Sequence, residues 1–211
     1  MSRSPKMAAS GRERSSPAPI PSPLGRHLFH ATVGSILPLA ALFAPEGGIL
    51  IATGILAAGS LTLELARFRY SPLNRLLVHW LSPLLKEGED RRLTGSTYLL
   101  IASFIAFLLF DRGVAIAALL FLSLGDPAAA LVGKRMPGPR VWGKSPGGTA
   151  AFVAVALLVV AVLVATGAVP YHWGLLIGAG VAGLVELAPL RLDDNLTIPL
   201  LSGAAMRLSA M

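Results

Sequence analysis

The stretch at residues 125–149, which reads GDPAAALVGKRMPGPRVWGKSPGGT, carries the residue types that bind phosphate groups. Basic side chains neutralise phosphate charge, and small residues let backbone N–H groups approach the oxygens. A helix N-terminus supplies further donors and a favourable dipole. From this composition we predict a nucleotide-phosphate site at a membrane surface. Its candidate residues are Lys134, Arg135, Lys144, Ser145, Gly147, Gly148 and Thr149.

Asp126 is an acid inside the apolar run that opens this stretch, and Pro127 follows it directly. A carboxylate inside a membrane segment is costly unless it is paired or coordinated, so we favour a functional role for it. Such a carboxylate could hold the magnesium that accompanies a nucleotide. The alternative is a structural ion pair with Lys134 or with an arginine of another helix.

Asp193, Asp194 and Asn195 form a second polar group, directly before the last apolar run. Their adjacent oxygen atoms suit a hard cation, and the same residue types suit a helix N-cap. Because a cap requires one residue and two carboxylates are present, we favour metal–nucleotide binding over capping alone.

Six further residues are weaker candidates, with a role in substrate binding. Each has a plain structural alternative: an interfacial histidine, a helix-end ion pair, or a solvated charged loop. The residues are His30, Glu64, Arg67, Lys86, Glu87 and Tyr98.

The composition identifies the environment in which these residues must be positioned. The 211 residues are 54% hydrophobic and 14% charged, which is too apolar for an ordinary soluble domain and indicates a polytopic membrane protein. The formal charge of +7 is explained by basic cytoplasmic loops, and we expect no nucleic-acid partner. Cysteine is absent, which excludes disulfides, thiolate catalysis and Cys-based zinc sites.

The chain after residue 25 is expected to form one all-α membrane domain, residues 26–211, with six or seven transmembrane helices. Residues 1–25 are rich in Ser, Pro and Arg and are predicted to be a disordered basic tail. Leucines and Trp80 recur with helical spacing over residues 73–84, which predicts one amphipathic helix, either lying in the membrane interface or packing on the bundle. The apolar runs lie at 28–44, 48–66, 95–110, 113–132, 149–167, 173–188 and 196–210.

The distribution of basic residues predicts the orientation of the bundle. Most Lys and Arg residues lie in the tail, in residues 67–92 and in residues 134–144, whereas the intervening loops contain only Arg112. With the N-terminus inside, every basic loop faces the cytoplasm. All the candidate chemistry therefore faces the compartment that contains nucleoside triphosphates.

Taken together, these motifs resemble the polyprenol kinase family, which includes dolichol kinase, phytol kinase and the CTP-dependent diacylglycerol kinase. The resemblance covers nearly all of the chain after the tail. His27 departs from the lysine expected after Arg26, and Pro146 stands where related sequences often have an acid. The matching stretches are GDPAAALVGKR (125–135), WGKSPGGT (142–149) and DDNLTIPL (193–200), with weaker matches at Arg26, His30, Gly34, residues 64–67 and the loop before Tyr98.

The resemblance implies a multi-pass membrane phosphotransferase that moves the γ-phosphate of CTP, with Mg²⁺, to the hydroxyl of a lipid alcohol such as diacylglycerol, phytol or a polyprenol. It implies that Asp126, Lys144 and Asp194 are catalytic and that Asp126, Asp193 and Asp194 hold the metal or activate the hydroxyl. Asn195 joins the phosphate-binding residues named above. The lipid bilayer is then a partner, and a homo-oligomer is compatible with the sequence.

Two other functions remain open from the residues alone. A cytidylyltransferase that attacks the α-phosphate of CTP with phosphatidate would use a similar phosphate loop. A small ion-coupled transporter or a scaffold would also carry intramembrane acids, but it would spread polar residues over several spans and both faces. Here the polar residues gather on one side.

Overall fold

The structure, a computed structural model, describes residues 23–81, 89 and 92–210, and this part of the chain contains eight helices and no strand. The predicted all-α class is confirmed. The helices are α1 (Pro23–Ala40), α2 (Glu46–Arg69), α3 (Ser71–Leu81), α4 (Gly95–Leu109), α5 (Arg112–Arg135), α6 (Pro146–Ala165), α7 (Trp173–Leu187) and α8 (Asp194–Ser209).

Each predicted apolar run corresponds to one helix, but not every helix has the properties of a membrane span. Three helices are long and apolar enough to cross a bilayer, namely α2, α5 and α6, and α4 and α7 are apolar but shorter. Of the six or seven predicted spans, three are therefore confirmed by length and composition. The first half of α1 contains Arg26, His27 and His30, and α8 contains Asp194 and Arg207 near its ends, which lowers the hydropathy of both helices.

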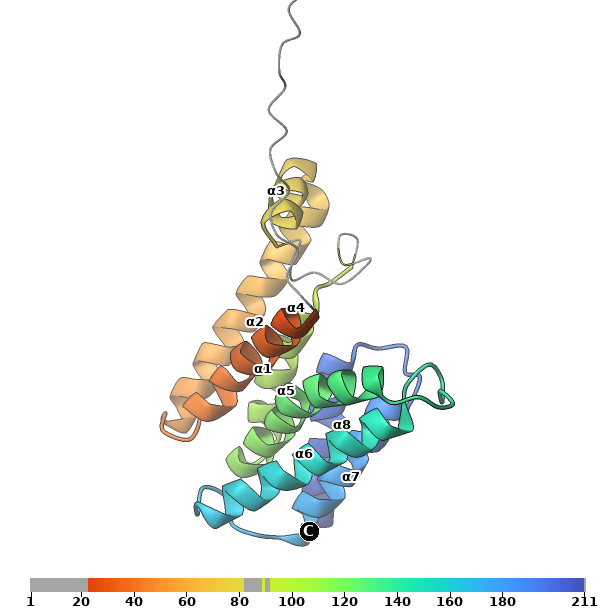
Figure 1. Cartoon of the computed structure of the whole chain (residues 1–211). Coiled ribbons are helices and arrows are strands. Elements are labelled where there is room, and N and C mark those ends of the chain that lie inside the picture. The colour runs from red at the N-terminus through yellow and green to blue at the C-terminus, as the bar shows by residue number, and fades with distance from the viewer. Residues whose placement is uncertain (1–22, 82–88, 90–91, 211) are drawn as a thin grey trace, which may run out of the picture.

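The central helix is α5, which is largely buried and packs against α1, α6 and α8 (Figure 1). Small residues permit this packing. A Cβ atom at Gly125 would lie 2.7 Å from the ring of Phe152, which is fully buried on α6. The absence of a side chain at Gly125 therefore sets how closely α6 packs on the central helix.

The helix ends that carry the polar motifs meet at one end of the bundle. The C-terminal ends of α5 and α7 lie there with the N-terminal ends of α6 and α8, because consecutive helices run in opposite directions (Figure 1). The N-terminus of α4 joins them, since Gly95 lies beside Asn195 of α8. Antiparallel packing thus gathers motifs that are up to 100 residues apart in sequence.

The predicted amphipathic helix is α3, which packs on α2. Leu73 and Leu77 are half-buried, whereas Leu76 and Trp80 are exposed. Both alternatives for this helix thus find partial support: one part of its apolar surface contacts the bundle, and another part is free to contact lipid. Leu84, which belongs to the predicted pattern, lies outside the described residues.

Candidate active site

A polar pocket of about 210 Å³ lies at the end of the bundle where α5, α6, α7 and α8 meet. Acidic and basic side chains from α5, α7, α8 and the loop between α5 and α6 line it, together with small residues that keep the space open. The lining residues are Asp126, Ala129, Ala130, Gly133, Lys134, Arg140, Gly143, Lys144, Ser145, Gly148, Glu186 and Asp194. The three residues predicted to be catalytic, Asp126, Lys144 and Asp194, are therefore brought together in one cavity.

Lys144 occupies the centre of the charged contacts in this pocket. Its Nζ atom donates to Asp194 Oδ2 at 2.9 Å and lies 3.8 Å from Glu186 Oε1. It also donates to the backbone carbonyl of Glu186. The ammonium group thus connects the loop before α6 to the end of α7 and the start of α8.

The two carboxylates beside Lys144 differ in their surroundings. Glu186 is buried, and its Oε2 accepts a hydrogen bond of 2.8 Å from Thr149 Oγ1 on α6. The side chain of Asp194 is about one-third exposed at 32%. Burial raises the pKa of Asp194, the nearby carboxylates Asp126 and Asp193 act in the same direction, and the hydrogen bond from Lys144 opposes them. The positive charge of Lys144 thus opposes the effect of burial on Asp194.

The N-terminus of α6 lies at the pocket, since Ser145 and Gly148 line it, and Ser145 caps this helix end. Ser145 Oγ accepts from Gly148 N at 3.4 Å, and Pro146 occupies the first helical position. A Cβ atom at Gly148 would lie 2.7 Å from the carbonyl oxygen of Ala129, so glycine lets the first turn of α6 approach α5. This approach brings the positive end of the helix dipole of α6 to the side of the pocket.

Lys134 lines the pocket from α5, although the sequence placed the end of the apolar run at residue 132 and Lys134 in a loop. The helix continues through Lys134 and Arg135, whose positive charges favour the C-terminal end of a helix. Pro127 lies inside the same helix, where it cannot donate the usual hydrogen bond to the carbonyl of Ser123. The helix is therefore continuous past Asp126 and lacks one backbone hydrogen bond at Pro127.

Asp193 and Asn195 have structural contacts beside the pocket. Asp193 is the N-cap of α8, and its Oδ1 accepts from Asn195 N at 2.9 Å and from Asn195 Nδ2 at 2.8 Å. Asn195 is buried. The capping alternative is therefore correct for Asp193, and its role as a metal ligand and that of Asn195 in nucleotide binding stay predictions.

The fit of magnesium to this pocket depends on two carboxylates. Within the described ranges, no three His, Cys, Asp or Glu side chains form a group that could hold a metal by themselves. Magnesium that accompanies a nucleotide is usually bound by one or two carboxylates together with phosphate oxygens. Asp126 and Asp194 both line the pocket and meet that requirement.

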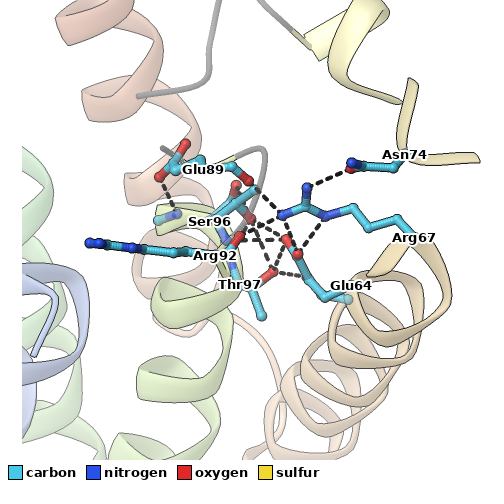
Figure 2. A network of polar contacts seen from close by, with 10 residues as sticks. Glu64, Arg67, Asn74, Glu89, Arg92, Ser96 and Thr97 are labelled. Carbon is cyan, nitrogen blue, oxygen red and sulfur yellow. Dashed lines mark hydrogen bonds and ion pairs between the residues drawn. The ribbon is translucent and has the colours of Figure 1, made fainter. Parts of the chain in front are cut away.

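Glu64 and Arg67 form a second polar cluster at the same end of the bundle, on α2 (Figure 2). Both are buried, and Arg67 Nε donates to Glu64 Oε2 at 2.6 Å, so the pair predicted from their spacing is present. Glu64 Oε1 accepts from Thr94 N at 3.1 Å and from Thr94 Oγ1 at 2.8 Å. Arg67 Nη2 donates to the carbonyls of Glu89 at 2.8 Å and Arg92 at 2.6 Å.

This cluster holds the segment that leads into α4. Glu89 Oε1 accepts from Gly95 N at 2.8 Å (Figure 2). A Cβ atom at Gly95 would lie 2.7 Å from Asn195 Nδ2. The contacts therefore run from α2 through Glu89, Arg92 and residues 94–97 to the start of α8. Glu64 and Arg67 thus hold the residues before α4 in place. Their part in substrate binding stays a prediction.

Several predicted site residues do not line the polar pocket. Arg135 is exposed at the end of α5, and Gly147 lies beside Met136. His30 is half-buried on α1, and Tyr98 is half-buried on α4. Lys86 and Glu87 lie outside the described residues.

Glu186 and Arg140 line the pocket but were not among the predicted site residues. The sequence signal for Glu186 was an acid near the end of an apolar helix, which is weak alone. Arg140 was visible as a basic residue in the loop. Glu89, Thr94 and Thr97 were also missed, although residues 94–98, TGSTY, were notable as small and polar residues at a helix start.

Two relatives are similar to most of the chain. An uncharacterized protein of Rickettsia prowazekii, RP860, is 28% identical over 181 residues, which cover 83% of this chain and 88% of the relative. CTP-dependent diacylglycerol kinase 1 of Schizosaccharomyces pombe is 27% identical over 168 residues, which cover 70% of this chain and 74% of the relative. No family model matches the chain, and no solved structure matches it.

Proposed function

We propose that this protein is a membrane-embedded lipid kinase that transfers the γ-phosphate of CTP to the hydroxyl group of a lipid alcohol of the diacylglycerol, phytol or polyprenol type. The observation that carries the proposal is the polar pocket, in which Asp126, Lys144 and Asp194 lie together. The similarity to the diacylglycerol kinase of Schizosaccharomyces pombe supports a lipid acceptor and CTP as the donor.

The reaction needs positioning and charge neutralisation more than covalent catalysis. The oxygen of the lipid hydroxyl forms a bond to the γ-phosphorus while the bond from that phosphorus to the β–γ bridging oxygen breaks, and CDP leaves. The hydroxyl proton passes to a carboxylate of the pocket. Lys134, Arg140 and Lys144 supply positive charge for the phosphates, and the N-terminus of α6 supplies backbone donors.

Magnesium would be held by Asp126 and Asp194 and would neutralise phosphate charge when bound with the nucleotide. In the structure Asp194 is bound to Lys144. A nucleotide with magnesium would give both residues new partners at once, since the phosphates attract Lys144 and the cation attracts Asp194.

The position of the pocket suits a reaction between a soluble nucleotide and a membrane lipid. Asp126 lies nine residues before the C-terminal end of α5, about 13 Å along the helix axis. The basic residues lie closer to that end, which we place at the cytoplasmic face because of their charge. The nucleotide would enter from water, and the lipid hydroxyl would reach Asp126 from the bilayer.

The test uses the purified full-length protein in nanodiscs with magnesium and a mixed lipid extract. Two parallel reactions contain CTP labelled on the γ-phosphate or on the α-phosphate. We expect lipid to be labelled only from the γ position, and the labelled product then identifies the acceptor. Label from the α position would establish a cytidylyltransferase, and label from neither position, with ATP also inactive, would remove the kinase proposal.

A further inference from the structure

A groove of about 1020 Å³ lies between α1 and α6, with α5 as its floor. Both flanking helices pack on α5, so the space between them is lined from three sides. The lining is almost entirely aliphatic. It includes Leu39 and Leu42 from the α1 side, Leu120 and Leu124 from α5, and Leu158 and Val162 from α6.

Two of the three helices that form the groove have the composition of membrane-spanning helices. The floor helix α5 and the flanking helix α6 are both long and apolar enough to cross a membrane. Leu158 is 61% exposed and Val162 is 52% exposed, so the wall formed by α6 is accessible to lipid. Along α6 and its C-cap residue the groove extends from Val155 to Thr166, about 16 Å along the helix axis. This length matches half of a hydrocarbon core about 30 Å thick.

One hydroxyl group in the groove, that of Ser35, is buried without a hydrogen-bond partner among the described residues. Ser35 is 7% exposed, yet its Oγ atom has no hydrogen-bond partner in the part of the chain that the structure describes. Thr32, three residues before Ser35 on α1, also lines the groove. A buried hydroxyl without a partner is destabilising, so an oxygen atom from a ligand would satisfy Ser35 at little cost.

The groove and the polar pocket share structural elements. His27 Nε2 lies 3.4 Å from Nζ of Lys134, which lines the pocket. Ala31, Ser35 and Leu39 follow His27 at four-residue steps, so they lie on the same face of α1, and all three line the groove. This face of α1 therefore begins beside the pocket and continues along the groove.

We propose that the groove binds a hydrocarbon chain of the lipid alcohol whose hydroxyl is phosphorylated in the polar pocket. Ser35 Oγ donates a hydrogen bond to an oxygen near the head of that lipid, and the chain lies along Leu39, Leu120 and Leu158. The identity of the bound lipid as the substrate rests on the proposed function, whereas the binding of the chain itself does not.

The first measurement of the test is photo-cross-linking, which requires no turnover. The full-length protein in nanodiscs is incubated with a diacylglycerol that carries a diazirine at the end of one acyl chain, and the labelled residues are identified by mass spectrometry. We expect label on groove residues of α1 and α6, reduced several-fold by excess unlabelled lipid alcohol. Label spread over all lipid-facing helices, or label that phosphatidylcholine displaces equally well, would overturn the proposal.

The second measurement compares two neighbouring leucines of α6. Leu158 lines the groove, whereas Leu157 is 41% exposed and does not. We expect L158W to lower groove labelling and to raise the KM for the lipid alcohol about tenfold with the KM for CTP unchanged. L157W should behave like the wild type. Ser35→Ala should raise the same lipid KM several-fold without lowering the thermal unfolding midpoint, because it removes a buried hydroxyl that has no protein partner among the described residues.

The two measurements separate the groove from the kinase function. Specific groove labelling in a protein that transfers no phosphate to any lipid would support chain binding and overturn the substrate assignment together with the proposed function. An active kinase in which L158W and Ser35→Ala match L157W would overturn the groove and leave the proposed function standing.

Discussion

Nζ of Lys144 lies 2.9 Å from Oδ2 of Asp194, so the loop before α6 and the first residue of α8 are joined by an ion pair inside the candidate site. Both side chains are about one-third exposed, at 30% and 32%. A pair of this exposure adds little stability by itself. Its position between the expected phosphate and metal ligands points to a role in catalysis, which the following experiments can separate from a role in folding.

We first predict how Lys144→Ala, Asp194→Asn and their combination differ in activity and stability. Each single variant should lower kcat/KM at least 100-fold, because each removes charge that would stabilise the transferred phosphate. Each should also lower the free energy of unfolding, since the remaining partner is left without its counter-charge. Radiolabel transfer from CTP and thermal unfolding in detergent measure the two effects.

The double variant provides the control for this pair. Residues in contact typically show coupling energies of about 0.5–3 kcal/mol, so the double variant should lose less stability than the sum of the single losses. Its activity should stay as low as in the single variants. Recovery of activity in the double variant would show that the pair only stabilises the fold.

We next predict that Asp126→Asn abolishes turnover while the protein still folds and inserts. The amide keeps the shape of the side chain and removes the charge that would hold magnesium and accept the hydroxyl proton. Asp111, at the opposite end of the same helix, makes no side-chain cap to α5 and offers a matched control. Asp111→Asn should keep nearly full activity, and equal activity in both variants would exclude Asp126 from the site.

The positions of the helices could be predicted from the sequence because apolar runs of nearly membrane-crossing length are interrupted by Gly, Pro and charged residues. The predicted end of this helix at residue 132 is too early, because α5 continues through Lys134 and Arg135, whose basic side chains favour a helix C-terminus. Two consecutive helical residues also point about 100° apart. This spacing explains why Lys134 lines the pocket and Arg135 does not.

Only those contacts of the candidate site that join residues close in sequence could be predicted. The pairing of Glu64 with Arg67 follows from their spacing of three residues on one helix. The pairing of Glu186 with Thr149 joins residues 37 positions apart, and it depends on how α7 packs against α6. Hydropathy and motif composition contain no information on that packing, so Glu186 was visible only as an acid near a helix end.

A matched pair of glycines gives the third prediction. A Cβ atom at Gly148 would lie 2.7 Å from the backbone oxygen of Ala129, whereas one at Gly147 would meet the flexible side chain of Met136. Gly148→Ala should therefore push α6 away from α5, with a loss of about 1–3 kcal/mol in the free energy of unfolding and a large loss of activity. Gly147→Ala should be tolerated, because Met136 can change rotamer.

Thermal unfolding and kinase assays on both glycine variants check this prediction. Equal tolerance of both changes would mean that the close contact of the first turn of α6 with α5 is not needed in the active protein. Equal damage would instead place Gly147 in direct contact with the substrate.

The last prediction concerns the buried pair of Glu64 and Arg67. Arg67→Ala should lower the free energy of unfolding by about 3–5 kcal/mol, because it leaves the Glu64 carboxylate buried without its counter-charge. It also removes the hydrogen bonds that hold the carbonyls of Glu89 and Arg92. Arg69→Ala, which removes an exposed arginine from the same helix end, should change stability by less than about 0.5 kcal/mol. Urea or thermal unfolding in a fixed detergent compares the two variants. A stable Arg67→Ala protein with an unchanged unfolding midpoint and a raised KM for the lipid would instead return Arg67 to the substrate-binding role predicted from the sequence.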